Sequence, residues 1–175
     1  MIRFAEDEAN NPKYAHIERE RRWRVDRTHR PVLAAAPSIL IEDRYIDGTR
    51  MRLRQMTDNA SGAVSRKLTK KYETGDPTAR PIVTTYLSDA EFALFDRLPG
   101  RTITKQRFPV DWEGKQFSLD IFEGALASLE LLEIEWPDAD GLHSIIPPPW
   151  AAYEVSHDPT YQGGTLAAQG IPENF

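Results

Sequence analysis

The chain has 175 residues, of which 40% are hydrophobic and 28% charged, a composition typical of one soluble globular domain. It contains no cysteine, which excludes disulfides, zinc–thiolate sites and thiol catalysis, and no apolar run approaches the roughly 20 residues of a membrane-spanning helix. The net charge of −5 is unevenly distributed, because all 22 Lys and Arg residues lie at or before Lys115 and the last 60 residues carry only carboxylates.

The chain is predicted to consist of a short arm and one domain. Residues 1–15 are expected to form a flexible N-terminal arm, and residues 16–175 a single domain long enough to bury a core. The first 11 residues are acidic and polar, which is atypical of a secretory signal peptide. Together with the lack of cysteine, this composition favours a cytoplasmic location.

The first half of the domain is predicted to be built from strands and tight turns. A strand pattern spans 17–25, and the segment 37–42 fits either a short helix or a strand. Residues 43–56 indicate a hairpin, because an Asp-Gly pair at 47–48 is typical of a turn between two strands. A turn at 59–62 leads into a strand over about 64–73, after which a Gly-Asp-Pro sequence interrupts the chain.

One amphipathic helix is predicted to begin after Ser88. The Ser88 side chain can cap its N-terminus, and Glu91 three residues later can complete a capping box. Phe92, Phe95 and Leu98 recur at helical spacing and predict a buried stripe. A Pro-Gly pair directly after Leu98 ends the helix.

Strands are predicted again in the last third of the chain. Two of them, at about 102–110 and 115–122, are joined by a turn near 112–114. Another is expected over 129–136, although 125–132 alone also fits a helix. Residues 145–149 indicate a stiff, proline-rich connector, and no regular element is predicted after Glu154.

Charged residues alternate along most of these strands. Because residues two apart in a strand share a face, each segment presents its charges on one side. The alternating residues are Glu18, Glu20, Arg22 and Arg24; Arg50, Arg52 and Arg54; Lys67 and Lys71; Lys105 and Arg107; and Glu133 and Glu135, with Asp120 on the strand that ends at Phe122.

Two arrangements account for this alternation. One is an antiparallel sheet with its charged face in water and ion pairs on its surface. The other is a closed barrel with its charges inside and its apolar faces covered by helices. Repetition over five or six strands favours the barrel. Its lumen would need a polyanion for the cations and a divalent ion for the carboxylates, since Arg suits phosphate and Mg²⁺ or Mn²⁺ prefers oxygen ligands.

In their order along the chain, these motifs resemble those of CYTH-type triphosphate tunnel metalloenzymes. The resemblance covers roughly residues 18–168. The matching stretches are Glu18-x-Glu20-x-Arg22, Arg52-Leu-Arg54, Leu68-Thr-Lys-Lys71, Lys105-Gln-Arg107, the segment from Asp120 to Gly124, Glu133-Ile-Glu135 and the segment from Pro149 to Ser156. The chain departs from the family in three ways: Arg22 replaces a Lys, no Lys or Arg follows Lys115, and Gln-Gly-Gly-Thr follows Tyr161 where many members have an Asn.

The resemblance implies an α+β fold, with a closed antiparallel barrel of about eight strands and helices packed outside. It implies metal-dependent hydrolysis of a triphosphate, inorganic tripolyphosphate being the first candidate substrate and Mg²⁺ or Mn²⁺ the cofactor. The implied roles are phosphate binding by Arg22, Arg52, Arg54, Lys71, Lys105 and Arg107; metal binding by Glu18, Glu20, Asp120, Glu133 and Glu135; and catalysis by Glu20, Asp120 and Glu135.

Other functions fit the same lumen. They are a class IV-like adenylate cyclase, a thiamine triphosphatase, and a polyphosphate- or nucleotide-binding module without turnover. Nucleic-acid binding is disfavoured, because half of the basic run 19–30 would face away from the lumen and the whole chain is acidic. The partner is therefore expected to be a small triphosphate, with no membrane involved, and the oligomeric state is left open.

Overall fold

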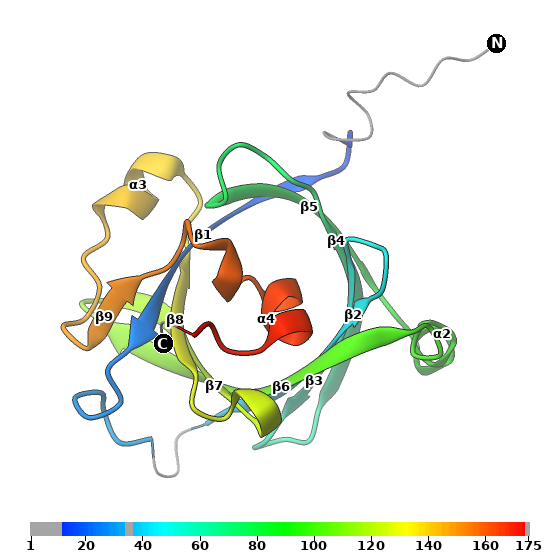
Figure 1. The fold of residues 1–175 in the computed structure, drawn as a ribbon, viewed down its shortest axis with the longest axis horizontal. Helices are drawn as coiled ribbons and strands as arrows, with labels where there is room; N and C mark the ends of the chain where they lie inside the picture. The colour runs from blue at the N-terminus through cyan, green and yellow to red at the C-terminus, as the bar shows by residue number, and fades with distance from the viewer. Residues whose placement is uncertain (1–11, 34–36, 174–175) are drawn as a thin grey trace.

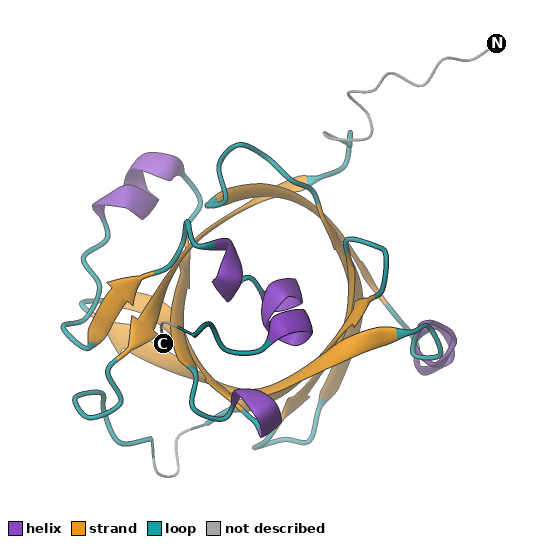
Figure 2. Cartoon of the chain, viewed as in Figure 1, coloured by secondary structure: helices purple, strands orange, loops and turns teal. Residues whose placement is uncertain are grey.

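One antiparallel sheet closes into a barrel in the computed structural model, which describes residues 12–33 and 37–173 (Figures 1 and 2). In the described part of the chain, eight strands form the closed wall in the order β5-β4-β3-β2-β6-β7-β8-β1, and β9 pairs with the end of β1 on the edge opposite β8. The strands are β1 His16–Val25, β2 Ile39–Ile46, β3 Met51–Asp58, β4 Val64–Lys71, β5 Ala79–Tyr86, β6 Gly100–Trp112, β7 Lys115–Phe122, β8 Glu130–Glu135 and β9 Ala151–Glu154. The predicted α+β barrel is confirmed. Most of the predicted N-terminal arm, residues 1–11, lies outside the described residues.

Strand β5 closes the barrel, and the sequence did not predict it. Its first half pairs with β1, where Arg80 lies opposite Glu18, and its second half pairs with β4. Pro77 and Pro81 obscured the strand, since proline lacks the N–H that a sheet ladder uses. The β-branched run that begins at Ile82 was the available signal.

Apolar side chains leave the barrel on its outer face and form two cores there. The larger core includes Trp23, Phe117, Leu119 and Leu132, and helix α3 (Ala139–Ser144) covers it with the connector that follows. Each of these side chains is at most 2% exposed, and full burial of a large apolar side chain is worth roughly 1.5–3 kcal/mol. The wall is therefore held from outside, which leaves the charged faces pointing inward.

Helix α2 (Asp89–Phe95) packs on the second outer core, whose buried residues are Ile46, Leu53 and Leu68. The predicted capping box is present, with Ser88 accepting from the Glu91 backbone and the Glu91 side chain accepting from the Ser88 backbone. Phe92 and Phe95 are partly buried against the wall, but Leu98 is 40% exposed, so the predicted buried stripe is wrong at that position. The reason is that the helix ends at Phe95, one turn early. None of the helices in the described ranges is long and apolar enough to span a bilayer.

The C-terminal segment enters the ring of strands, whereas α2 and α3 lie outside it (Figure 1). It contains the short 3₁₀ helix η2 (Pro159–Tyr161) and helix α4 (Gly163–Gln169), neither of which was predicted. Tyr161 and Leu166 are buried against Ile103, Phe122 and other inward apolar residues. These contacts form an apolar layer inside the barrel, and residues of α4 line the cavity next to it.

Gly163 allows this segment to approach the wall. A Cβ atom at Gly163 would lie 1.8 Å from the Tyr45 hydroxyl oxygen, whereas one at Gly164 would lie no closer than 3.5 Å to the same ring. We expect Gly163→Ala to displace α4 and lower the free energy of unfolding by roughly 1–3 kcal/mol. Gly164→Ala is the matched control and should be neutral or stabilising, because alanine favours helices. Urea denaturation of both variants tests this, and equal stabilities would contradict the contact.

Candidate functional site

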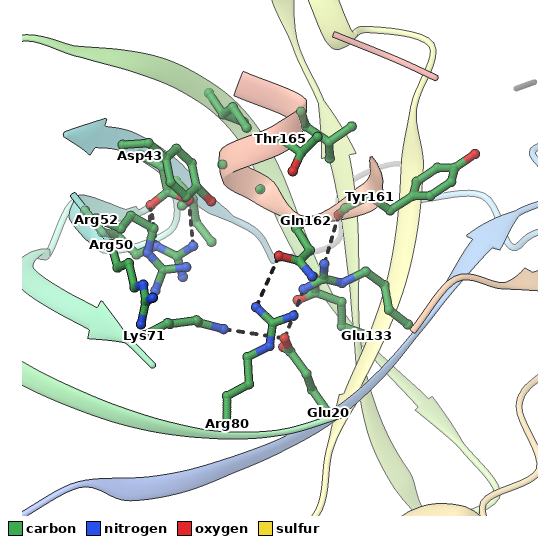
Figure 3. Close-up of a pocket in the computed structure, with 18 of the residues that line it drawn as sticks. Glu20, Asp43, Arg50, Arg52, Lys71, Arg80, Glu133, Tyr161, Gln162 and Thr165 are labelled. Carbon is green, nitrogen blue, oxygen red and sulfur yellow. Dashed lines mark hydrogen bonds and ion pairs between the residues drawn. The ribbon is translucent and has the colours of Figure 1, made fainter. Parts of the chain in front are cut away.

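The barrel interior contains a cavity of about 670 Å³ lined by charged side chains (Figure 3). It brings together ten of the eleven residues that the sequence singled out, namely Glu18, Glu20, Arg22, Arg52, Arg54, Lys71, Lys105, Arg107, Glu133 and Glu135. The eleventh, Asp120, does not line the cavity. Its side chain is fully buried in the wall, where it accepts from Lys105 and receives two hydrogen bonds from Arg107, at 2.6 and 2.7 Å.

The carboxylates of the cavity gather on two neighbouring strands, β1 and β8. Glu20 lies directly opposite Glu135 in the sheet register, and Arg22 lies opposite Glu133. Arg22 is 2.9 Å from Glu133 and 3.2 Å from Glu20. Arg22 also donates to the Tyr161 carbonyl at 3.0 Å, which ties the C-terminal segment to this acidic wall.

Lys71 and Arg107 form further ion pairs with the glutamates of the acidic wall. Lys71 forms an ion pair with Glu18 and lies 3.4 Å from Glu20, while Arg107 is 2.5 Å from Glu133. Burial opposes the ionisation of Glu20 and Glu133, but Arg22 and the other neighbouring cations outweigh it. The pKa values of both carboxyls are therefore lowered, and both stay ionised at neutral pH.

Glu135 differs from the other three glutamates. Within the described part of the chain it has no ion-pair partner, and its side chain lies accessible at the rim of the cavity. Partial loss of hydration there, followed by the charges of Glu18, Glu20 and Glu133, raises its pKa. Glu135 is thus the carboxylate of this wall that would gain most from a proton or a cation.

Cations gather on the opposite side of the cavity, on β3 and β4. Figure 3 shows Arg52 and Asp43 facing Glu20 and Glu133 across the open space. Lys67 lies opposite Arg54 in the register, and no carboxylate in the described ranges lies within ion-pair distance of it. Burial, Arg54 and Arg52 all lower the pKa of Lys67, so this ammonium would be stabilised by an incoming anion.

The structure adds lining residues that sequence reasoning missed. Asp43 comes from β2, whose inward positions are otherwise apolar or aromatic, so the charge alternation passed over it. Arg80 comes from the unpredicted β5 and donates at 3.2 Å to the Pro77 carbonyl and to the Gln162 side chain. Gln162 itself lies at the start of α4. Because both acceptors of Arg80 are neutral, its charge remains available to an anion.

The acidic wall has the oxygen ligands that a divalent cation prefers, but these ligands are not already arranged around one point. Among the residues that the structure describes, no three acidic or histidine side chains converge on one point. The glutamates of β1 and β8 nevertheless supply the hard oxygen donors that Mg²⁺ and Mn²⁺ prefer. Three of these four glutamates are engaged by Arg22, Lys71 or Arg107, and those ion pairs would open as an ion bound.

Known proteins resemble this chain over part of its sequence and in its fold. No family model matches the sequence. An inorganic triphosphatase of Nitrosomonas europaea is 37% identical over 75 residues, which is 42% of this chain. This match spans 50% of the length of that relative.

Solved structures extend the likeness to most of the chain. The crystal structure of the inorganic triphosphatase NE1496 has a TM-score of 0.57 at 26% identity, covering 89% of this chain and 96% of that one. A Bacillus halodurans protein assigned provisionally as an adenylate cyclase has a TM-score of 0.50 at 14% identity, covering 74% and 85%. The second likeness is one of fold alone.

Proposed function

Because the chain folds as a CYTH-like domain, we propose that it hydrolyses a triphosphate inside the barrel, with inorganic tripolyphosphate as the first candidate substrate. The observation that carries this proposal is a single cavity with an acidic wall on β1 and β8 and cations facing it. The name inorganic triphosphatase, given both to the sequence relative and to the solved structure, supports it. A bound Mg²⁺ or Mn²⁺ would neutralise phosphate charge and activate water.

The cations are proposed to bind and orient the phosphate chain. Arg52, Arg54, Lys71, Lys105, Arg107 and Arg22 would bind phosphate oxygens. They would be joined by Lys67, which the sequence analysis placed on the same face without a role, and by Arg80, which the structure adds to the cavity. Charge-assisted contacts of this kind are each worth roughly 1.5–3 kcal/mol. Lys67 and Arg80 are the most available, since neither is neutralised by a carboxylate among the described residues.

The carboxylates are proposed to divide into three roles. Glu18, Glu20 and Glu133, with Glu135, would hold the metal on the acidic wall. Glu135 would also accept the proton of the attacking water, because it is the one glutamate of these four that forms no ion pair among the described residues. We assign Asp120 a different role from the one the resemblance implied: buried behind Lys105 and Arg107, it would hold these two cations in place.

Phosphate release tests the proposed function. We expect release from tripolyphosphate with Mg²⁺ or Mn²⁺, and its loss by at least about 100-fold in excess EDTA, with recovery when the metal is restored. ATP and thiamine triphosphate, assayed in parallel, compare the alternative substrates, and cyclic AMP formation from ATP would indicate a cyclase. Full activity in EDTA would contradict the metal dependence. Binding of tripolyphosphate with no turnover of any substrate would leave a binding module.

A further inference from the structure

Asp43 is a carboxylate on the cationic side of the cavity. It lies on the inward face of β2 and is only 3% exposed. Arg54 donates two hydrogen bonds to it, from Nε at 2.6 Å and from Nη2 at 2.7 Å, and the Arg52 Nε atom lies 3.6 Å away. The two oxygens of Asp43 thus occupy the fork of the Arg54 guanidinium.

This is the arrangement that a phosphate would need. Two parallel N–H donors of a guanidinium bind two oxygens of either a carboxylate or a phosphate. A phosphate that approaches Arg54 must therefore displace Asp43 or share the guanidinium with it. Sharing brings two anions together at a buried position, where water screens their repulsion poorly.

Asp43 is placed differently from the other carboxylates in the ion pairs of the lumen. Glu18, Glu20 and Glu133 lie on the acidic wall, where a metal ion can bridge them to a phosphate. Asp43 pairs across the sheet with Arg54 of β3 and with Ile103 of β6, on the side that faces this wall. The neighbouring arginines hold the pKa of Asp43 well below its usual range despite its burial, so it remains charged at neutral pH.

We propose that Asp43 is a positioning residue that weakens the grip of Arg54 and Arg52 on phosphate, so that the lumen releases its phosphate products. The inference rests on the proposed function, in which tripolyphosphate is cleaved to pyrophosphate and orthophosphate. Without Asp43, both arginines would meet the anion unopposed and products would stay bound. With Asp43, the internal carboxylate replaces each departing product at Arg54.

The test compares Asp43→Asn with the parent by calorimetric binding of pyrophosphate and tripolyphosphate without metal. The asparagine side chain is not charged, but it has nearly the same shape as aspartate and still offers Arg54 one oxygen. One charge removed within about 5–8 Å of a bound phosphate should tighten binding of both ligands by about tenfold or more. Inhibition of turnover by pyrophosphate should strengthen by a similar factor.

Glu42→Gln is the matched control. Glu42 neighbours Asp43 on the same strand, but it is exposed and accepts a hydrogen bond from Gln55 on the outer face. It loses the same unit of charge outside the lumen, so affinity should stay within about twofold of the parent. Asp43→Glu, which keeps the charge, should retain affinity near the parent value. If Glu42→Gln or Asp43→Glu tightens binding as much as Asp43→Asn, competition at Arg54 is wrong.

If Asp43→Asn is less stable than the parent, thermal unfolding with and without pyrophosphate still compares the affinities of the two proteins. The increase in melting temperature caused by pyrophosphate should be larger in Asp43→Asn than in the parent, whatever the starting stability. Unchanged or weaker binding by Asp43→Asn, beside a parent that hydrolyses tripolyphosphate, overturns the inference and leaves the proposed function intact. Tighter pyrophosphate binding by Asp43→Asn in a protein that hydrolyses no triphosphate would support competition at Arg54, but it would overturn the proposed function and, with it, the role in product release.

Discussion

Glu135→Gln is expected to fold as stably as the parent while losing its turnover by about 100-fold or more. The loss follows from its proposed role as proton acceptor, since general base catalysis contributes roughly 10²–10⁴-fold. Stability should hold, because Glu135 forms no ion pair within the described ranges and is repelled by Glu18, Glu20 and Glu133. Removing its charge relieves that repulsion.

The same variant separates binding from chemistry. Metal-free tripolyphosphate binding by Glu135→Gln should equal or exceed that of the parent, because a negative charge has left the cavity rim. Calorimetry beside a phosphate-release assay measures both quantities. Glu123→Gln is the control, since Glu123 is exposed and accepts a hydrogen bond from Gln106 outside the lumen. Full turnover by Glu135→Gln would contradict the assigned role.

Arg54→Ala should lower the free energy of unfolding by roughly 3–5 kcal/mol, because it leaves the buried carboxylate of Asp43 without its bidentate partner. Arg52 remains 3.6 Å from Asp43, which is too far to replace two short hydrogen bonds. Triphosphate binding should weaken as well. Denaturant unfolding and calorimetry of the variant measure the two effects separately.

Lys67→Ala is the matched control for Arg54→Ala. Lys67 lies opposite Arg54 on the neighbouring strand, but its removal leaves no carboxylate unpaired among the described residues. We expect its stability to stay within about 0.5 kcal/mol of the parent, while its tripolyphosphate affinity falls by about tenfold. Equal destabilisation of the two variants would mean that the Asp43–Arg54 pair does not stabilise the fold.

Acid provides a second test of the same pair. Because the pKa of Asp43 is lowered in the folded state, its pairing stabilises the fold above the unfolded pKa of about 3.9. This contribution is lost as the pH falls from there through the folded pKa. The stability difference between the parent and Arg54→Ala should therefore be full at pH 5–7 and should narrow below pH 4. If the stability difference does not change with pH, the destabilisation of Arg54→Ala comes from lost packing and not from the lost ion pair.

The period of the charges favoured a barrel over an open sheet, and the resemblance of the ordered motifs to a known family then implied its closed, eight-stranded form. Side chains alternate across a strand, so an Arg-x-Arg or Glu-x-Glu pair places both charges on one face whatever surrounds the strand. Turns and caps are equally local: Gly48 has a φ of +69° at the predicted hairpin turn, and the Ser88–Glu91 box formed as expected. These features depend on neighbours within a few residues, which a sequence displays directly.

Strand β5 and the C-terminal segment depended on the tertiary structure. Two prolines obscured β5, and only the need to pair the open edges of β1 and β4 makes it a strand. Likewise, α4 is a short helix rich in glycine that is stabilised by the buried contacts of Leu166 and of Tyr161 in the preceding η2. Local propensity is weak in both segments, so packing decided them.

The partners of each charge were also decided by the tertiary structure. The sequence grouped Asp120 with the glutamates, but the register of β6 and β7 places it opposite Arg107 and buries it. Charge alternation did not identify Asp43, because it is a single carboxylate on an otherwise apolar strand face and does not belong to a repeating pattern. Periodicity determines the face on which a charge lies. Its partner, its burial and therefore its pKa depend on strands more than ten residues away, which only the closed barrel brings together.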